Sequence, residues 1–146
     1  MKKVMLDNYK KDRCYPKVVN AVDQLLSSEK YVTPIRVFQS MGLLEEKDIE
    51  SWQKGQVPFL ERVIGCNLHK ASRILRILRF VAHDLKLKPS MTVYKRKVRG
   101  GKVPLRFTKF NDKNLEEAYA RHFIVVGTLG AHQAGQSLPE SGASEP

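Results

Sequence analysis

Apolar residues recur at helical spacing in several short segments of the first half of the chain. A wide apolar stripe at residues 16–28 predicts a first helix. Thr33-Pro34, an N-cap residue followed by proline, opens a second helix that Gly42 ends. Two more short helices are expected between residues 45 and 64, the first with an acidic start and the second opened by Pro58. This succession of helices and tight turns is typical of helix-turn-helix modules, and also of many other small helical cores.

The longest helical pattern follows at residues 68–87, where apolar residues recur every three or four positions. At about 100° per residue, Arg73, Arg76 and Arg79 fall on the opposite side of this helix. Phe80 projects among the arginines, where it either stacks on a base or packs against the hairpin described next, and packing is the simpler role. The helix is therefore expected to be apolar on one side and cationic on the other.

Residues 91–109 change to an alternating pattern that predicts a β-hairpin. Gly100-Gly101 supplies the two positive-φ positions of a tight turn, and this register sets Arg99 opposite Lys102. Because side chains alternate along a strand, the two faces of the hairpin differ. The apolar face holds Tyr94, Val98, Val103, Leu105 and Phe107. The cationic face holds Lys95, Lys97, Arg99, Lys102 and Arg106. Like charges set opposite each other destabilise a ladder, so these pairs favour an anion between them.

The rest of the chain predicts one more helix and a tail. The helix is expected at residues 115–125 with Asn114 as its N-cap, and the tail at residues 127–146, rich in Gly, Ala, Ser and Pro, is expected to be disordered. The predicted organisation is a basic N-terminal arm at residues 1–13, a single helical domain at residues 14–126 that carries the hairpin, and the disordered tail.

The fold expected from these elements is mainly α (α+β). It is a compact helical domain with a helix-turn-helix-like core and one two-stranded antiparallel β-hairpin, in a winged-helix-like arrangement. An isolated hairpin is only marginally stable in water, so its apolar face is expected to pack on the body. The candidate platforms are the long helix around Leu75 and Leu78, and the final helix around Tyr119 and Phe123. Either platform leaves the cations outside.

The net charge of +11 is concentrated in one part of the 146-residue chain. Residues 68–110 hold 13 Lys or Arg and a single acidic residue, Asp84. Residues 1–67 carry a net charge of +2, and residues 111–146 one of −3. A run of charges is usually a solvated face, but cations gathered on one helix and the next hairpin favour a polyanionic partner.

Cysteine usage and hydropathy bear on the compartment and on metal binding. Cys14 and Cys66 are isolated, which suits a reducing compartment. No apolar run has the length of a signal peptide or of a membrane span, so a cytoplasmic protein is expected. Cys66-x-x-His69 resembles half of a metal site, but a structural zinc site needs four ligands, so neither a metal nor a cofactor is expected.

These features predict a non-catalytic nucleic-acid-binding protein, a regulator or accessory factor that binds duplex DNA in preference to RNA. The candidate binding residues are Arg73, Arg76, Arg79, Lys95, Lys97, Arg99, Lys102 and Arg106. The alternative is an interaction module that docks the same basic face on an acidic protein partner. Binding to a membrane surface is disfavoured because no apolar residues accompany the cations. The sequence shows no catalytic motif, so no residue is predicted to have a catalytic role.

One further pattern carries a resemblance. Residues 52–63 read W-x-x-G-x-V-P-x-L-E-R-V, and the segments P-S-x-T-x-Y, L-R-F and E-x-A-Y follow later in the chain. In these segments the chain resembles small uncharacterised bacterial proteins, over residues 31–125. No function is attached to that group, so the resemblance implies no activity and no residue role.

Overall fold

Five α-helices, two 3-10 helices and five short strands make up residues 8–126, the part of the chain that the computed structural model describes. The elements are η1 (Tyr9–Lys11), α1 (Tyr15–Ser28), β1 (Tyr31–Val32), α2 (Pro34–Ser40), α3 (Glu46–Gln53), η2 (Leu60–Val63), α4 (Leu68–Asp84), β2 (Lys88–Met91), β3 (Lys95–Val98), β4 (Gly101–Pro104), α5 (Lys113–Ala120) and β5 (Arg121–Ile124). The fold is mixed α+β and mostly helical.

The amphipathic segments form helices close to where the sequence predicts them. Thr33 caps α2, because its hydroxyl accepts a hydrogen bond from the Arg36 amide at 3.1 Å. The helix expected after Pro58 is only the 3-10 turn η2. The long helix α4 ends at Asp84, three residues early, and Lys86 just beyond it takes a positive φ of +60°.

A three-stranded antiparallel sheet, which the sequence analysis did not predict, lies in the middle of the structure. Its order is β1-β5-β2, so the last strand of the chain is the central one. The prediction of a helix through residue 125 was wrong, because α5 ends at Ala120 and the next four residues pair with both neighbours. The expected N-cap was also wrong, since Asp112 caps α5 by accepting from the Leu115 amide at 3.0 Å.

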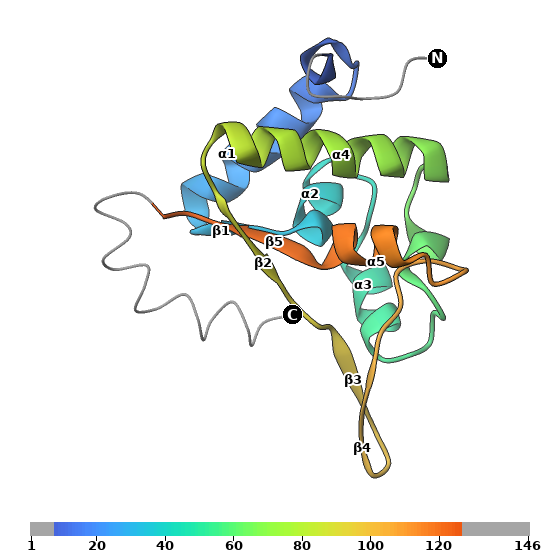
Figure 1. Ribbon diagram of the computed structural model, residues 1–146. Coiled ribbons are helices and arrows are strands. Elements are labelled where there is room, and N and C mark those ends of the chain that lie inside the picture. Colours follow the sequence, from blue (N-terminus) through green and yellow to red (C-terminus); the bar gives the residue numbers. More distant parts are fainter. Residues whose placement is uncertain (1–7, 127–146) are drawn as a thin grey trace.

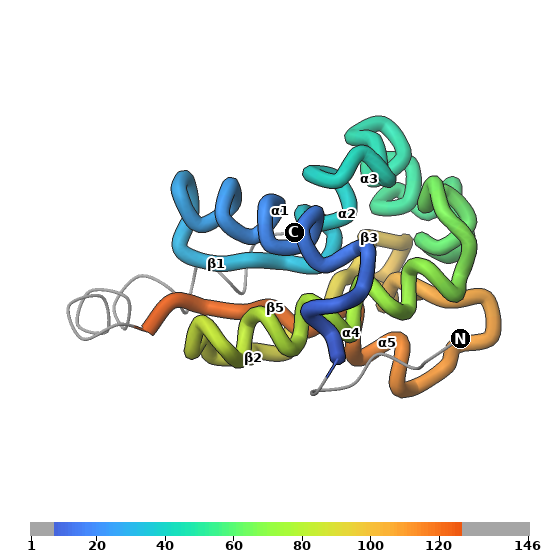
Figure 2. The backbone as a smooth tube through the Cα atoms, turned by 90° about the horizontal axis from the view of Figure 1, so that it is seen from above, coloured from blue at the N-terminus to red at the C-terminus, as the bar shows by residue number. Residues whose placement is uncertain are grey.

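The helices α1 and α4 pack against each other along one side of this sheet, and the hairpin β3–β4 leaves on the other side (Figure 1). Seen from above, α1 runs beside β1 while α4 runs beside β5 and β2 (Figure 2). The buried side chains between the layers form one cluster that includes Phe38, Trp52, Leu60 and Tyr119.

Residues 8–13, which the sequence analysis assigned to the N-terminal arm, include the 3-10 helix η1. Tyr9 in this segment is buried, with its ring 5.6 Å from that of Tyr15 and 5.1 Å from that of Phe80. The first seven residues and the predicted tail at residues 127–146 lie outside the described residues. Within residues 8–126, no helix combines the length and the apolar character needed to cross a membrane.

Candidate nucleic-acid interface

The hairpin forms at the predicted place, but its register is shifted by two residues. Lys97 faces Lys102, so the turn consists of Arg99 and Gly100 rather than of the two glycines. Of these two residues only Gly100 is left-handed, with a φ of +86°, which is the conformation that a type II turn requires at its second central position. The expected pairing of Arg99 with Lys102 was therefore wrong, and Lys97 and Lys102 are the like-charged pair across the ladder.

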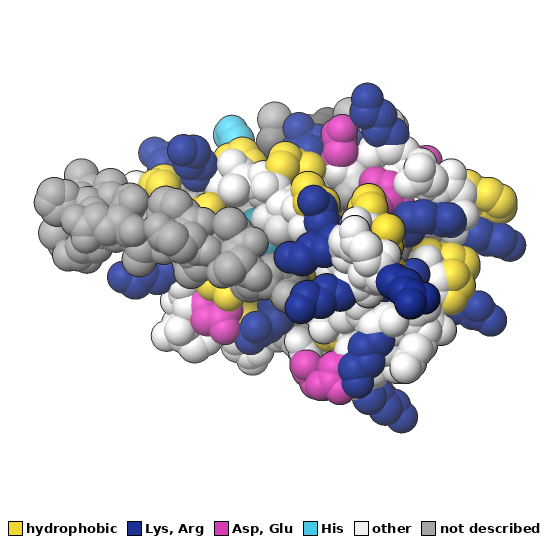
Figure 3. Space-filling model, turned by 90° about the horizontal axis from the view of Figure 1, so that it is seen from below, with side chains coloured by type: hydrophobic (Ala, Val, Ile, Leu, Met, Phe, Trp, Pro, Cys, Tyr) yellow, Lys and Arg dark blue, Asp and Glu magenta, His cyan; other side chains and the backbone are white. Residues whose placement is uncertain are grey.

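The two faces of the hairpin are those that the sequence predicts, because a shift of two residues preserves the alternation of side chains. Val98, Val103 and Leu105 on one face are half-buried. The exposed cations are Lys95, Lys97, Arg99 and Lys102. None of the ion pairs within residues 8–126 involves these four side chains. Seen from the side of the hairpin, Lys and Arg side chains gather around the middle of this face and carboxylates are few (Figure 3).

An aromatic cluster holds the root of the hairpin. Tyr94 precedes β3 and Phe107 follows β4, and their ring centroids are 5.4 Å apart. Both rings lie against Trp52 of α3, at 5.6 Å and 5.1 Å. Phe107 also stacks on Tyr119 of α5 with centroids 5.2 Å apart. The platform is therefore made by α3 and α5, of which only the final helix was expected.

Hydrogen bonds and one close approach fix the same root. The Arg106 carbonyl accepts from Trp52 Nε1 at 2.7 Å and from the Leu60 amide at 3.2 Å. The side chain of Arg96, on the half-buried face, covers Gly55 just beyond α3, where a Cβ atom would lie 2.6 Å from Nε. Arg96 was not among the candidate residues, because alternation places it on the apolar face. It adds a cation at the base of the hairpin.

Arg106 braces the loop that follows the hairpin. Its guanidinium donates to the carbonyl oxygens of Thr108 and Lys109. The side chain remains exposed, so it lies at the root of the cationic face while its donors are partly used within the protein. Of the five hairpin cations predicted as binding residues, the four nearer the tip are the ones without such internal bonds.

Arg73 does not contribute to an open surface. Its guanidinium donates to both carboxylate oxygens of Asp12, at 3.0 Å from Nε and 2.9 Å from Nη2. The two side chains are only 17% and 13% exposed. Hydrogen bonds from Arg73 favour the charged carboxylate and lower the pKa of Asp12 to about 2. The protein's own carboxylate therefore neutralises this candidate residue.

Arg76 and Arg79 are exposed, but they line a different surface. Together with Arg121, Phe80 and Phe123 they border a groove of about 500 Å³ between α4 and β5. The prediction that Phe80 packs against the hairpin was wrong, since its ring lies on that of a tyrosine in η1. This groove adjoins the cationic side of α4, and no hairpin residue lines it.

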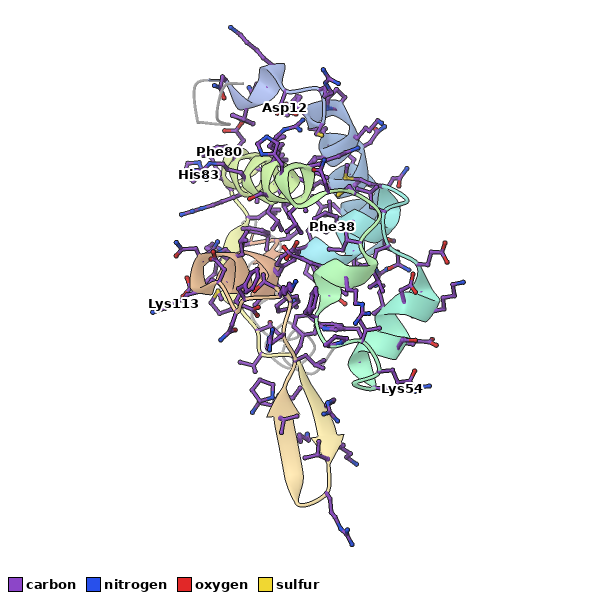
Figure 4. All side chains as sticks on the ribbon, turned by 90° about the vertical axis from the view of Figure 1, so that its right-hand side faces the viewer. Asp12, Phe38, Lys54, Phe80, His83 and Lys113 are labelled. Atoms are coloured by element: carbon purple, nitrogen blue, oxygen red, sulfur yellow. The ribbon has the colours of Figure 1, made fainter. Side chains whose placement is uncertain are left out.

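The two cationic sets lie at opposite ends of the molecule. In Figure 1, α4 runs along the top and the hairpin points away at the bottom. A second view agrees, with Phe80 and His83 at one end and Lys54 near the end from which the hairpin projects (Figure 4). The structure thus brings together the hairpin cations, and separates them from Arg76 and Arg79.

Two residues with buried polar side chains, His122 and Glu61, contact the hairpin root. His122 on β5 makes hydrogen bonds with the Tyr94 hydroxyl through Nε2, at 2.7 Å, and with the Thr92 hydroxyl through Nδ1, at 3.2 Å. Burial lowers the pKa of His122 to about 4. Glu61 accepts from the Tyr119 hydroxyl at 2.8 Å, and burial raises the pKa of this carboxyl above its usual value. The His122 ring thus holds the start of the hairpin, and the Glu61 amide holds its end by donating to the Phe107 carbonyl at 2.9 Å.

The described residues therefore offer a set of exposed, unneutralised cations at the hairpin. Within residues 8–126, no group of three or more His, Cys, Asp or Glu side chains is placed to hold a metal ion, and the Cys66-x-x-His69 pair gains no third ligand there.

Comparison of the chain with protein-family models, with curated proteins and with solved structures finds no match.

Proposed function

We propose that this protein binds nucleic acid through its hairpin, with duplex DNA preferred over RNA. The observation that carries the proposal is a set of four exposed cations on one anchored hairpin, none of them in an ion pair within residues 8–126. Lys97 and Lys102 face each other across the ladder, where their repulsion costs stability. A phosphate that binds between them removes that cost.

The dimensions of the hairpin suit a duplex groove. The major groove of B-DNA is about 12 Å wide and about 8.5 Å deep, and it admits a two-stranded β-ribbon. The chain from Tyr94 in the aromatic cluster to Gly100 at the turn spans about 20 Å, at about 3.3 Å per residue. The tip can reach the floor of the groove while the root stays outside. The deep, narrow major groove of A-form RNA does not admit side chains, which is the reason for preferring DNA.

The proposed docking uses the hairpin alone. A winged-helix-like arrangement would require a helix to enter the groove on the side from which the hairpin projects. The cationic helix α4, with Arg76 and Arg79, lies at the opposite end of the molecule (Figure 1). Proteins that read DNA with a β-ribbon need no such helix. The hairpin then makes the contacts and the helical body remains outside the duplex.

The test is the salt dependence of binding to a short DNA duplex, measured by fluorescence anisotropy. At about 0.9 per phosphate contact, four contacts predict that log K falls with log salt with a slope of about −3.6. The variant Arg99→Ala/Lys102→Ala removes two contacts and should make the slope shallower by about 1.8. The matched control is Arg76→Ala/Arg79→Ala, which removes the same charge from α4 and should leave the slope unchanged.

Two outcomes would contradict this proposal. One is an affinity that does not depend on salt, and the other is an equal effect of the hairpin variant and its α4 control. The same proteins also test the alternative of an acidic protein partner. Such a partner would co-purify with the wild type after nuclease treatment and be lost from the hairpin variant.

A further inference from the structure

One aromatic side chain stands apart from the others. The single tryptophan, five tyrosines and six phenylalanines of the chain all lie within residues 8–126. Phe110, in the loop between β4 and α5, is the exposed one among them, at 83%. Single exposed apolar residues are ordinary on protein surfaces. What distinguishes Phe110 is the loop that holds it and the charges around it.

Hydrogen bonds fix this loop on both sides of Phe110. The Glu116 carboxylate accepts from the amide and from the hydroxyl of Thr108, both at 2.8 Å. The same hydroxyl accepts from the Asp112 amide at 2.9 Å. Asn111 takes a left-handed φ of +56°, which turns the chain directly after the ring. The loop therefore has a defined shape that keeps an apolar ring in water.

One cation lies beside the ring, and the hairpin is close along the chain. Lys109 Nζ lies 5.3 Å from the centroid of the Phe110 ring, and Lys113 begins α5 three residues later. The six residue steps from Pro104, the end of β4, to Phe110 place the two Cα atoms within about 20 Å of each other. One nucleic-acid molecule is large enough to contact the hairpin and this ring together.

We propose that Phe110 is a stacking platform for an unpaired base, and that the preferred ligand is a DNA duplex with a single-stranded extension. The inference rests on the proposed function of the hairpin. Inside a duplex, neighbouring base pairs cover both faces of each base, so a side chain finds a free face only where the duplex ends, and an unpaired base there can turn to meet the ring. In this arrangement the hairpin binds the duplex part, and the ring stacks on an unpaired base of the extension.

The size of the effect follows from stacking. An aromatic side chain stacked on one base strengthens binding by about 5- to 150-fold, which corresponds to 1–3 kcal/mol. The wild type should therefore bind a duplex with a short thymidine extension at least about fivefold more tightly than the same duplex with blunt ends. No such preference is expected from the hairpin alone, because its cations contact phosphates of the paired region.

The experiment compares blunt and extended duplexes, by anisotropy, for the wild type and three variants. Phe110→Ala should bind both duplexes with the affinity that the wild type has for the blunt one. Phe110→Trp, which keeps an aromatic face, should retain the preference. The matched control Leu68→Ala removes another exposed apolar side chain, at the start of α4, and should also retain it. Since the Phe110 ring is exposed, Phe110→Ala should unfold at the wild-type temperature.

The outcomes separate the two proposals. Equal affinities of the wild type for both duplexes, or a preference that survives in Phe110→Ala, would overturn the stacking role and leave the hairpin proposal standing. Failure of the wild type to bind the blunt duplex in a salt-dependent way would instead overturn the proposed function. A lost preference in Phe110→Ala with unchanged thermal unfolding supports the stacking role.

Discussion

Exchange of Lys102 for Glu should have opposite effects on folding and on binding. Lys97 and Lys102 face each other across the hairpin ladder, so Lys102→Glu turns a like-charged pair into an opposite one. Two unit charges about 6 Å apart in water interact by about 0.7 kcal/mol, and the change of sign doubles this to at most about 1.4 kcal/mol. Screening and exposure reduce the gain to several tenths of a kcal/mol. The variant should be slightly more stable than the wild type.

The same substitution should weaken binding to the DNA duplex. It replaces one phosphate contact by a repulsion, so the salt slope should become shallower by about 0.9 or more. At low salt we expect the affinity to fall about tenfold, equivalent to about 1.4 kcal/mol. Lys17→Glu, an equal change of charge on the exposed side of α1, is the control and should change the affinity by less than about twofold.

Thermal unfolding and anisotropy measured on the same preparations decide between these effects. A Lys102→Glu variant that is destabilised would refute the register, because the two side chains would then not be opposite each other. A variant that is more stable but binds as tightly as the wild type would refute the placement of the interface on the hairpin. Only an increase in stability together with weaker binding agrees with both.

The remaining predictions concern the body of the protein. The pKa of His122 is about 4 in the folded protein and about 6.5 in an unfolded chain. The contribution of the neutral ring to stability is therefore complete above about pH 6.5. It is lost as the pH falls toward about 4, by up to roughly 3 kcal/mol. Urea unfolding across this range should show a shallower decline for His122→Gln than for the wild type, and parallel declines would refute the assignment. Asp12→Asn leaves the charge of Arg73 unpaired at a mostly buried position and should lower the free energy of unfolding by about 3 kcal/mol. Its salt slope for DNA should equal that of the wild type, and a steeper slope would return Arg73 to the interface, because the freed guanidinium would then contact a phosphate.

Sequence reasoning succeeded where residues interact with near neighbours in the chain. The cap at Thr33 and the apolar stripe of α4 are local signals, and both helices form where these signals place them. The two faces of the hairpin follow from alternation, which does not depend on the residue at which the turn is made. The error in the register came from treating Gly100-Gly101 as the turn, although the glycine at position 100 alone supplies the left-handed residue.

Local signals of this kind do not predict contacts between segments that are distant in the chain. The sheet is built from strands of two to four residues, and residues 121–124 become a strand because they pair with segments about 30 and 90 positions away. The ion pair of Asp12 with Arg73 joins residues 61 positions apart. A short connection was expected to keep α4 beside the hairpin. Instead β2 carries the chain along the sheet, from the side that α4 covers to the side from which the hairpin projects (Figure 1).

The hydrogen bond between Tyr94 and His122 couples the hairpin to the rest of the molecule. It ties the start of β3 to the central strand, and the Thr92 amide donates to the Ala120 carbonyl beside it at 3.1 Å. The hairpin is therefore held by the central strand β5 through these hydrogen bonds, as well as by the edge strand β2 through the chain itself. A ligand bound at the tip would thus fix the orientation of the whole body, with the groove bordered by Arg76 and Arg79 facing away from that ligand.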